Sequence, residues 1–373
     1  MVVRIKSEVP EMILFFVNIG VLLLLAALCP RPQLGRYRID AQKLYVVLAM
    51  GYLMLLAALR SPVVGTDTLS YCRYFRSAAS CDSLHRAWSV LRLEKGYVTF
   101  LYLLTRITAN EQWLLVVSSV FSFYSFGRFI SRYSRMPWMS VLLFYLLMLF
   151  DFFLSGMRQM LAIAILLFAY DKLREKKPIP FLLLVLLAVT VHSSAVLFLL
   201  LYPICHAKNQ RRCLTVVFAL AILVAVCWRP LLRVMLLLFP KYSYYSGDEA
   251  FSSSGNLAVL SKLAVYALVL LFGVLFGGKQ TPEKGDVINF RSVCLLMVVC
   301  IVALRANVVS RLFRNIEPIL CLYLPNLLAE KEEKEKRAGW ILCVICFIAY
   351  ATVIQLLRTP AWQRTYPYLF FWS

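Results

Sequence analysis

The sequence predicts an all-α integral membrane protein that crosses the bilayer many times and forms a single transmembrane domain over residues 1–373. The first observation is composition: 61% of the 373 residues are hydrophobic and 16% are charged, against roughly 25% charged in an average soluble domain. The second is a mean hydropathy of +0.75. The third is that long apolar runs alternate with short basic stretches, which is typical of polytopic helical proteins. Together these observations exclude a water-soluble enzyme and a disordered chain.

Twelve apolar runs mark the expected crossings. Several are shorter than the ~20 residues of a full crossing, so we expect their ends to extend into flanking polar residues. A thirteenth run, residues 97–109, is short and carries Arg106. We therefore predict about twelve transmembrane helices and a short re-entrant or interfacial helix at 97–109. The twelve runs are roughly 12–29, 44–59, 112–128, 138–150, 159–171, 180–190, 194–205, 214–228, 257–276, 291–304, 315–328 and 340–357.

Basic loops set the expected orientation, because Lys and Arg accumulate in cytoplasmic loops. Six basic loops share one side only if 97–109 does not cross, so we assign them to the cytoplasm and both termini to the outside. A crossing at 97–109 is the alternative, and it would place the four basic residues of loop 31–43 outside. We expect the N-terminal run to remain as a span, since Leu28 before Cys29 does not fit a cleavage site. The six loops, with 21 Lys and Arg in 66 residues, are 31–43, 128–137, 172–180, 206–213, 277–291 and 329–339.

The outer side carries further basic residues, and most of them are Arg. The net charge of +21 would suggest nucleic acid in a soluble protein, but the cytoplasmic loops explain about half of it, and we expect no nucleic-acid partner. Arg is suited to bidentate binding of phosphate. The pattern therefore predicts an anionic ligand met at the outer leaflet, with ordinary attraction to anionic membrane lipids as the alternative.

Loop 60–96 is the longest polar segment and contains GTDTLSYCRYF. We interpret Asp67 as a carboxylate at the membrane surface that deprotonates an acceptor hydroxyl or holds a substrate. The simpler alternative is a turn or a helix cap. Arg73 and Arg76 follow on one helical face. Glu94 comes just before the short helix and is either a second catalytic carboxylate or a cap, since helix N-termini attract carboxylates.

Arg158 and Gln159 begin an apolar helix. A buried Arg in a membrane span costs roughly 2.5–3.5 kcal/mol, so we expect Arg158 to face a wet cavity or a partner. Snorkelling toward lipid headgroups is the alternative reading. His192 lies between two apolar runs and is either a structural histidine bonded to a carbonyl or an imidazole in the same outer cavity.

Metal, cofactor and redox sites are not expected. Only two other histidines exist, His85 and His206, and the second falls on the opposite side. Cys72 and Cys81 share one polar loop and either pair or remain free thiols. The two cysteines of a CxxC spacing at 343–346 lie in an apolar run without a nearby His, so we assign them no chemistry.

The late segment RANVVSRLFRNIEPIL carries three more arginines. Arg311 and Arg314 are three residues apart, which predicts one shared helix face. We expect Arg314 and Glu317 to form a surface ion pair worth about 0–1 kcal/mol. All the candidates fall on the outer side in the proposed topology. They are Asp67, Glu94 and His192 as catalytic residues, and Arg73, Arg158, Gln159, Arg305, Arg311 and Arg314 as binding residues.

The ordered motifs GTDT-x2-Y-x3-F, E-x-G, RQ-x-LA and HSSA, followed by the Arg-rich late segment, resemble the EpsG-like family of exopolysaccharide and capsule polymerases, grouped with Wzy-type O-antigen polymerases. The resemblance covers about residue 44 to the end. Leu312 follows Arg311 where many relatives carry an aromatic residue.

This resemblance implies a multi-pass glycosyltransferase of the bacterial inner membrane that needs no cofactor. Its substrate would be an oligosaccharide linked to undecaprenyl diphosphate, and the growing glycan would move to a hydroxyl of the next lipid-linked unit. A flippase and a chain-length regulator are the implied protein partners. By analogy with GT-C transferases, which use an acidic residue in an early outer loop, Asp67 would be that residue.

Two other functions remain as alternatives. A flippase for the same lipid-linked units also needs basic residues in a wet cavity, but such proteins usually show two similar halves, and this sequence shows no repeat. A membrane acyltransferase would use His192 as its base.

Overall fold

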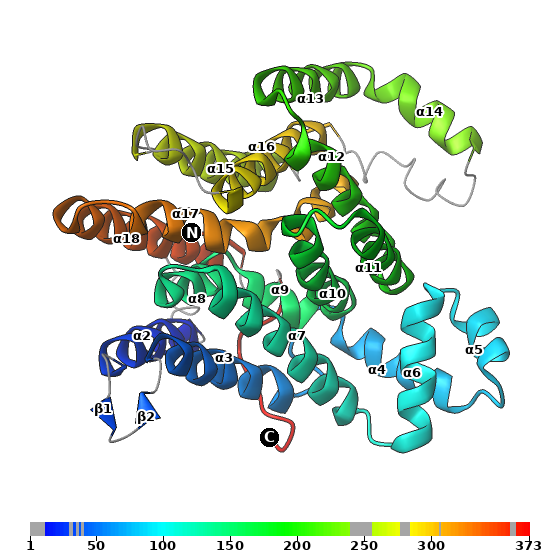
Figure 1. The fold of residues 1–373 in the computed structure, drawn as a ribbon. Coiled ribbons are helices and arrows are strands. Elements are labelled where there is room, and N and C mark those ends of the chain that lie inside the picture. The colour runs from blue at the N-terminus through cyan, green and yellow to red at the C-terminus, as the bar shows by residue number, and fades with distance from the viewer. Residues whose placement is uncertain are drawn as a thin grey trace.

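The computed structural model describes residues 12–29, 33–34, 37–38, 41–238, 256–276, 284–305, 307–358 and 363–373 as a bundle of helices (Figure 1). The described strands are β1 (Gln33–Leu34) and β2 (Tyr37–Arg38), an antiparallel pair. The first half of the chain forms α2 (Ile13–Leu28), α3 (Ala41–Leu59), α4 (Thr68–Ala79), α5 (Leu84–Leu91), α6 (Lys95–Ile107), α7 (Gln112–Tyr133), α8 (Pro137–Leu146), α9 (Leu149–Ser155), α10 (Met157–Arg174) and α11 (Pro178–Val191).

The second half continues with helical elements of very unequal length. They are the 3₁₀ helix η2 (Ser193–Leu200), α12 (Leu201–His206), α13 (Gln210–Val226), α14 (Trp228–Leu238), α15 (Asn256–Phe276), α16 (Lys284–Ala303), the short 3₁₀ helices η6 (Asn307–Arg311), η7 (Phe313–Asn315) and η8 (Glu317–Ile319), α17 (Leu320–Ala329) and α18 (Glu333–Arg358).

The helical class is confirmed, whereas the expected twelve crossings are not. Among the described residues, α3, α7 and residues 333–357 of α18 are long and apolar enough to cross a membrane, and α8 with α9 makes a fourth span if the bent pair counts as one. Six further apolar segments of the described residues have only 10–17 residues each, and two of the apolar runs are broken. Run 138–150 bends by 50° between α8 and α9, at Met148 with φ 62°. Run 194–205 divides into a 3₁₀ helix and a short α-helix.

Helices α4, α5 and α6 lie together at one end of the bundle (Figure 1). The Gln112 side chain, at the start of α7, donates to the carbonyls of Ala58 (2.6 Å) and Arg60 (3.2 Å) at the end of α3. The chain therefore leaves α3 and enters α7 at the same end. This geometry agrees with the expectation that residues 97–109 do not cross. We call this end the α4–α6 end.

The core lies around α8, α9 and α10, whose side chains are buried almost throughout. Helix α7 packs against α3 at Gly127, which lies against Met50 of α3. The buried Ser118, Ser122 and Ser125 lie on the opposite face of α7, the face whose Phe129 packs on Tyr170 of α10. Small side chains allow close packing of helices in a membrane, where apolar side chains gain little by leaving lipid.

The C-terminal residues fold back along the loop after α3. The N–H of Phe371 donates to the Leu59 carbonyl (2.9 Å), and that of Gly65 donates to the Arg364 carbonyl (3.0 Å). Gly65 has φ +95°, and a Cβ there would lie 2.1 Å from the Leu154 carbonyl oxygen. Only glycine fits this position, so the loop that carries Asp67 is fixed between α9 and the tail.

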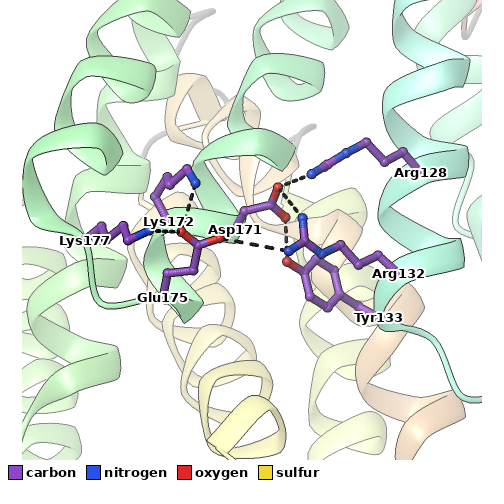
Figure 2. A network of polar contacts seen from close by, with 7 residues as sticks. All are labelled: Arg128, Arg132, Tyr133, Asp171, Lys172, Glu175 and Lys177. Carbon is purple, nitrogen blue, oxygen red and sulfur yellow. Dashed lines mark hydrogen bonds and ion pairs between the residues drawn. The ribbon is translucent and has the colours of Figure 1, made fainter.

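The opposite end of α7 and α10 holds a polar network (Figure 2). Asp171 accepts hydrogen bonds from Arg128, from Arg132 (3.2 Å) and from the Tyr133 hydroxyl (2.6 Å). Two of the basic loops expected in the cytoplasm, 128–137 and 172–180, begin at this network. Their meeting at one end is consistent with the predicted topology.

Candidate functional site

The candidate site lies at the α4–α6 end, where the start of α10 meets the loops before α6 and after α11. At its centre, Arg158 Nη1 donates to Glu94 Oε2 at 2.6 Å, and each side chain is about one-fifth exposed. Arg158 follows Gly156, at the break between α9 and α10. The predicted partner of Arg158 is thus a protein carboxylate, on a helix that the sequence places 64 residues earlier.

Glu94 stands at the N-cap position of α6, but its side chain does not cap that helix. Its second oxygen instead accepts the backbone N–H of Ser193 at 3.0 Å. Burial raises the pKa of the Glu94 carboxyl, but the Arg158 charge and the Ser193 N–H outweigh it, so the pKa lies below its usual value. Glu94 is therefore ionised at neutral pH.

Close packing of α6 on α11 brings Glu94 to Ser193. A Cβ on Gly96 would lie 2.2 Å from the Thr190 hydroxyl oxygen. Glycine thus permits an approach between α6 and α11 that no larger residue allows. This explains the E-x-G motif physically: the Gly sets the distance, and the Glu two residues earlier reaches the neighbouring helix end.

His192 lies just after α11 and is oriented by Ser194 and Asn315. The Ser194 N–H points at His192 Nδ1 (3.3 Å), and the Ser194 hydroxyl lies 2.7 Å from the same nitrogen. The Asn315 amide donates to the Ser194 hydroxyl (3.1 Å) and carbonyl (3.0 Å). Because a backbone N–H can only donate, Nδ1 is the acceptor, and the neutral ring carries its proton on Nε2.

The His192 imidazole is neutral at physiological pH. Burial lowers its pKa to about 4, and the Arg158 charge acts in the same direction. With Nδ1 occupied, the ring presents an Nε2–H donor. This arrangement favours a hydrogen-bond donor at the site over a general base.

Gln159 ties α10 to the late segment. Its buried amide donates to the Arg311 carbonyl at 2.8 Å. The Arg311 side chain is exposed at the end of η6. Its charge acts on both His192 and Tyr71, so the Arg311 side chain lies within electrostatic range of these two residues.

Asp67 stands at the N-cap position of α4, yet its side chain forms no capping hydrogen bond. The carboxylate is exposed, and it makes no hydrogen bond or ion pair within the described part of the chain. One turn later Tyr71 is buried, and the charges of Asp67, Arg158 and Arg311 all act on its phenol. The cap interpretation of Asp67 is therefore wrong for its side chain.

Three predicted binding residues lie apart from this cluster. Arg73 is exposed and donates to Ser70, and Arg305 is exposed at the end of α16. Arg314 does not share a helix face with Arg311, because the segment breaks into separate 3₁₀ helices.

The predicted pair between Arg314 and Glu317 forms, but its expected place at the surface is wrong. Arg314 Nη1 donates to Glu317 Oε2 at 2.7 Å, but the Glu317 side chain is fully buried. The other carboxylate oxygen of Glu317 accepts hydrogen bonds from Lys262 and from the Tyr266 hydroxyl (2.9 Å), both of α15. The segment turns into the bundle, so the pair is a buried network instead of a solvated one.

Sequence reasoning missed several residues of the site and its support. Ser194 and Asn315 orient His192. The sequence features that could have indicated them are the HSSA motif, which contains Ser194, and the Arg-Asn pair at 314–315. Lys262 is a cation within an apolar run. An ionisable residue at such a position is expected to have a charged partner or a role in function. Tyr71 and Tyr97 were also missed: both are buried, and the Tyr97 ring lies against the Arg158 guanidinium.

The described residues contain no group of three or more His, Cys, Asp or Glu that could hold a metal. Cys72 and Cys81 are both free thiols, so the pairing alternative is wrong.

Comparison with known proteins gives one match. A family model described as the EpsG family matches residues 43–370. No curated protein and no solved structure matches the chain.

Proposed function

The chain belongs to the EpsG family, and from that premise we propose that it is a polysaccharide polymerase of the bacterial inner membrane. Its substrates are oligosaccharide repeat units linked to a polyprenyl diphosphate, and the reaction takes place at the outer face. A flippase that delivers the units and a chain-length regulator act with it. The observation that carries this proposal is the convergence of Arg158, Glu94, His192 and Arg311 at one end of the bundle.

The proposed reaction is a glycosyl transfer. The oxygen of an acceptor hydroxyl forms a bond to the anomeric carbon of the growing glycan, and the bond from that carbon to the diphosphate oxygen breaks. The diphosphate leaves with the electron pair of that bond, and the hydroxyl proton passes to a base. No nucleotide sugar and no metal enters this balance.

The leaving diphosphate gains negative charge as its bond breaks. Arg158, Arg311 and the Nε2–H of His192 are the cationic and neutral donors of the cluster, and removing one such donor typically costs about 10²–10³ in rate. Glu94 orients Arg158 before substrate arrives. Its carboxylate accepts hydrogen bonds from Arg158 and from the Ser193 N–H. A phosphate oxygen can accept hydrogen bonds from the same two donors.

Asp67 is the proposed base. Its carboxylate is exposed and has no hydrogen-bond or ion-pair partner among the residues that the structure describes, whereas Glu94 is paired with Arg158. A general base must be ionised and within hydrogen-bond reach of the acceptor hydroxyl when substrate is bound.

Asp67→Asn and Asp67→Ala test this role. Because the side chain caps nothing, both variants should keep normal abundance by immunoblot. Both should lower polymerisation of purified lipid-linked units by roughly 10²–10⁴, the factor typical of a positioned base. Asp82→Asn is the matched control, since Asp82 is an exposed carboxylate of the same loop. Wild-type polymer from a normally abundant Asp67→Asn protein would remove Asp67 as the base and make Glu94 the next carboxylate to test.

Deleting the gene separates a polymerase from a flippase. A polymerase leaves single repeat units on lipid at the outer face, whereas a flippase leaves them in the inner leaflet. The acyltransferase alternative needs a basic imidazole, and the donors on His192 Nδ1 do not favour it.

A further inference from the structure

An apolar groove of about 330 Å³ lies beside the candidate site. Ligand pockets typically measure about 300–1,000 Å³. The groove lies among α6, α7, α10 and α11, and its walls offer no polar surface. Its lining is Tyr97 and Phe100 of α6, Val117 and Phe121 of α7, Leu161 and Ile165 of α10, and Val191 of α11.

The groove adjoins the charged cluster at two places. Tyr97 lines the groove, and its ring lies 5.7 Å from the Arg158 guanidinium. Val191 lines the groove and directly precedes His192. An apolar channel that ends at a cation fits an amphiphile with an anionic head and a hydrocarbon chain.

Two buried polar atoms at this junction have no partner. The Tyr97 hydroxyl and Arg158 Nε form no hydrogen bond within the residues that the structure describes, although Tyr97 is fully buried. Buried donors are nearly always paired in folded proteins. Unpaired donors beside an apolar groove therefore point to a ligand that brings an acceptor.

We propose that this groove holds the part of the hydrocarbon chain nearest the head of the lipid diphosphate substrate, and that the Tyr97 hydroxyl and Arg158 Nε, which are covered in this structure, turn to donate to its first phosphate when the lipid binds. The inference rests on the proposed function for the identity of the lipid. It adds where the chain lies and makes Tyr97 a substrate-binding residue. A bulk phospholipid in the groove is the competing outcome.

Binding is tested first, without catalysis. A photoreactive polyprenyl diphosphate that carries no sugar is cross-linked to the full-length protein in nanodiscs, and the labelled peptides are mapped. The expected labels fall on α6, α7 and α10, and excess phospholipid does not compete. Even labelling of other lipid-facing helices, such as α2 and α18, or displacement by phospholipid, would overturn the proposal.

The second experiment fills the groove with larger side chains. Val117→Phe and Ile165→Trp add volume on two different walls, so one misfolded variant does not decide the test. Val120→Phe is the matched control, because Val120 lies on α7, is exposed and does not line the groove. We expect each filling variant to raise the KM for a long-chain donor about tenfold and to change that for a two-isoprene donor less than twofold. Equal effects on both donors, or no effect, would contradict the proposal.

Tyr97→Phe removes only the unpaired hydroxyl. It should weaken binding of the sugar-free lipid diphosphate about tenfold, the range for a hydrogen bond to a charged group, and leave thermal stability unchanged. Unchanged binding would overturn the role of Tyr97. If the wild-type protein binds the lipid in the groove but makes no polymer, the proposed function fails and the groove assignment stands.

Discussion

Helix α10 carries Arg158 in its first turn and Asp171 in its last, and each charge lies at the end where the helix dipole disfavours it, although Lys172 and Arg174 in the last turn have the favoured sign. The two charges differ in how many hydrogen-bond partners they have. Asp171 is saturated, since one oxygen accepts two arginines and the other accepts Tyr133 (Figure 2). Arg158 has one carboxylate partner and an Nε without a partner among the described residues. At the Asp171 end the carboxylate is fully used and holds the helices together, although Arg128 Nη1 also has no partner among the described residues. At the Arg158 end a single carboxylate holds the arginine, which leaves donors for a substrate.

Among the substitutions at the two ends of α10, Arg158→Lys should change the polymerisation rate most. Lys keeps the charge and can still pair with Glu94, but it loses the planar fork that binds phosphate bidentately. We expect polymerisation to fall about 10²–10³-fold with normal abundance, measured with reconstituted protein and by immunoblot.

Arg132→Lys is the control at the other end, where Arg128 still holds Asp171, and its rate should stay within about twofold. Full activity in Arg158→Lys would make headgroup snorkelling the better account of this arginine.

Asp171→Asn should produce the opposite pattern, with lost stability and retained catalysis. Asn keeps an acceptor but leaves Arg128 without its counter-charge. The free energy of unfolding should fall by about 1–3 kcal/mol, measured by denaturation in detergent, with kcat unchanged.

Glu175→Gln is the control for Asp171→Asn, because Glu175 lies at the surface of the same network and should shift stability by less than about 0.5 kcal/mol. A lower kcat at unchanged stability in Asp171→Asn would show that the Asp171 end also serves the reaction.

His192 predicts a pH effect on stability. Its pKa is about 4 in the folded protein and about 6.5 in an unfolded chain. Between these values the unfolded state binds more protons, so stability falls as the pH drops from 7 to 5, by at most about 2 kcal/mol.

His192→Asn should remove this pH dependence, because Asn does not titrate. Parallel slopes for the wild type and the variant between pH 5 and 7 would mean that the imidazole titrates normally. The polymerisation rate should likewise show no transition near pH 6.5 that belongs to His192.

The smallest expected effect is the coupling between the two ends. Residues 158 and 171 are about 20 Å apart along the helix. The stability changes of Arg158→Lys and Asp171→Asn should therefore add within about 0.3–0.5 kcal/mol in the double variant. A coupling above about 1 kcal/mol would show that α10 links the ends, and the comparison would fail.

The sequence predicted which residues gather but not how they pair. The six basic loops fix which side of the membrane each loop lies on. This assignment alone predicted that Asp67, Glu94, Arg158, His192 and Arg311 lie at one end. The Glu94–Arg158 contact depends on how closely α6 packs on α11, and a hydropathy pattern carries no such distance.

The shared face of Arg311 and Arg314 was wrong, and the count of twelve crossings is not confirmed, for a related reason. Residues 307–319 form three separate 3₁₀ helices, and the break at Leu312 between η6 and η7 leaves Arg311 exposed and Arg314 buried. Burial of Glu317 depends on Lys262 of α15, a partner 55 residues away. Apolar runs locate helical segments, but they do not reveal breaks such as Met148, which are set by packing in the core.

The tail that holds the Asp67 loop has a consequence for the order of biosynthesis. Residues 363–371 are translated about 300 residues after the loop they bond, which at 5–20 residues per second means roughly 15–60 s. During that interval Gly65 has no Arg364 carbonyl to bond. The bundle is thus inserted first and the loop is fastened afterwards, so a nascent chain in the membrane does not yet carry a finished loop.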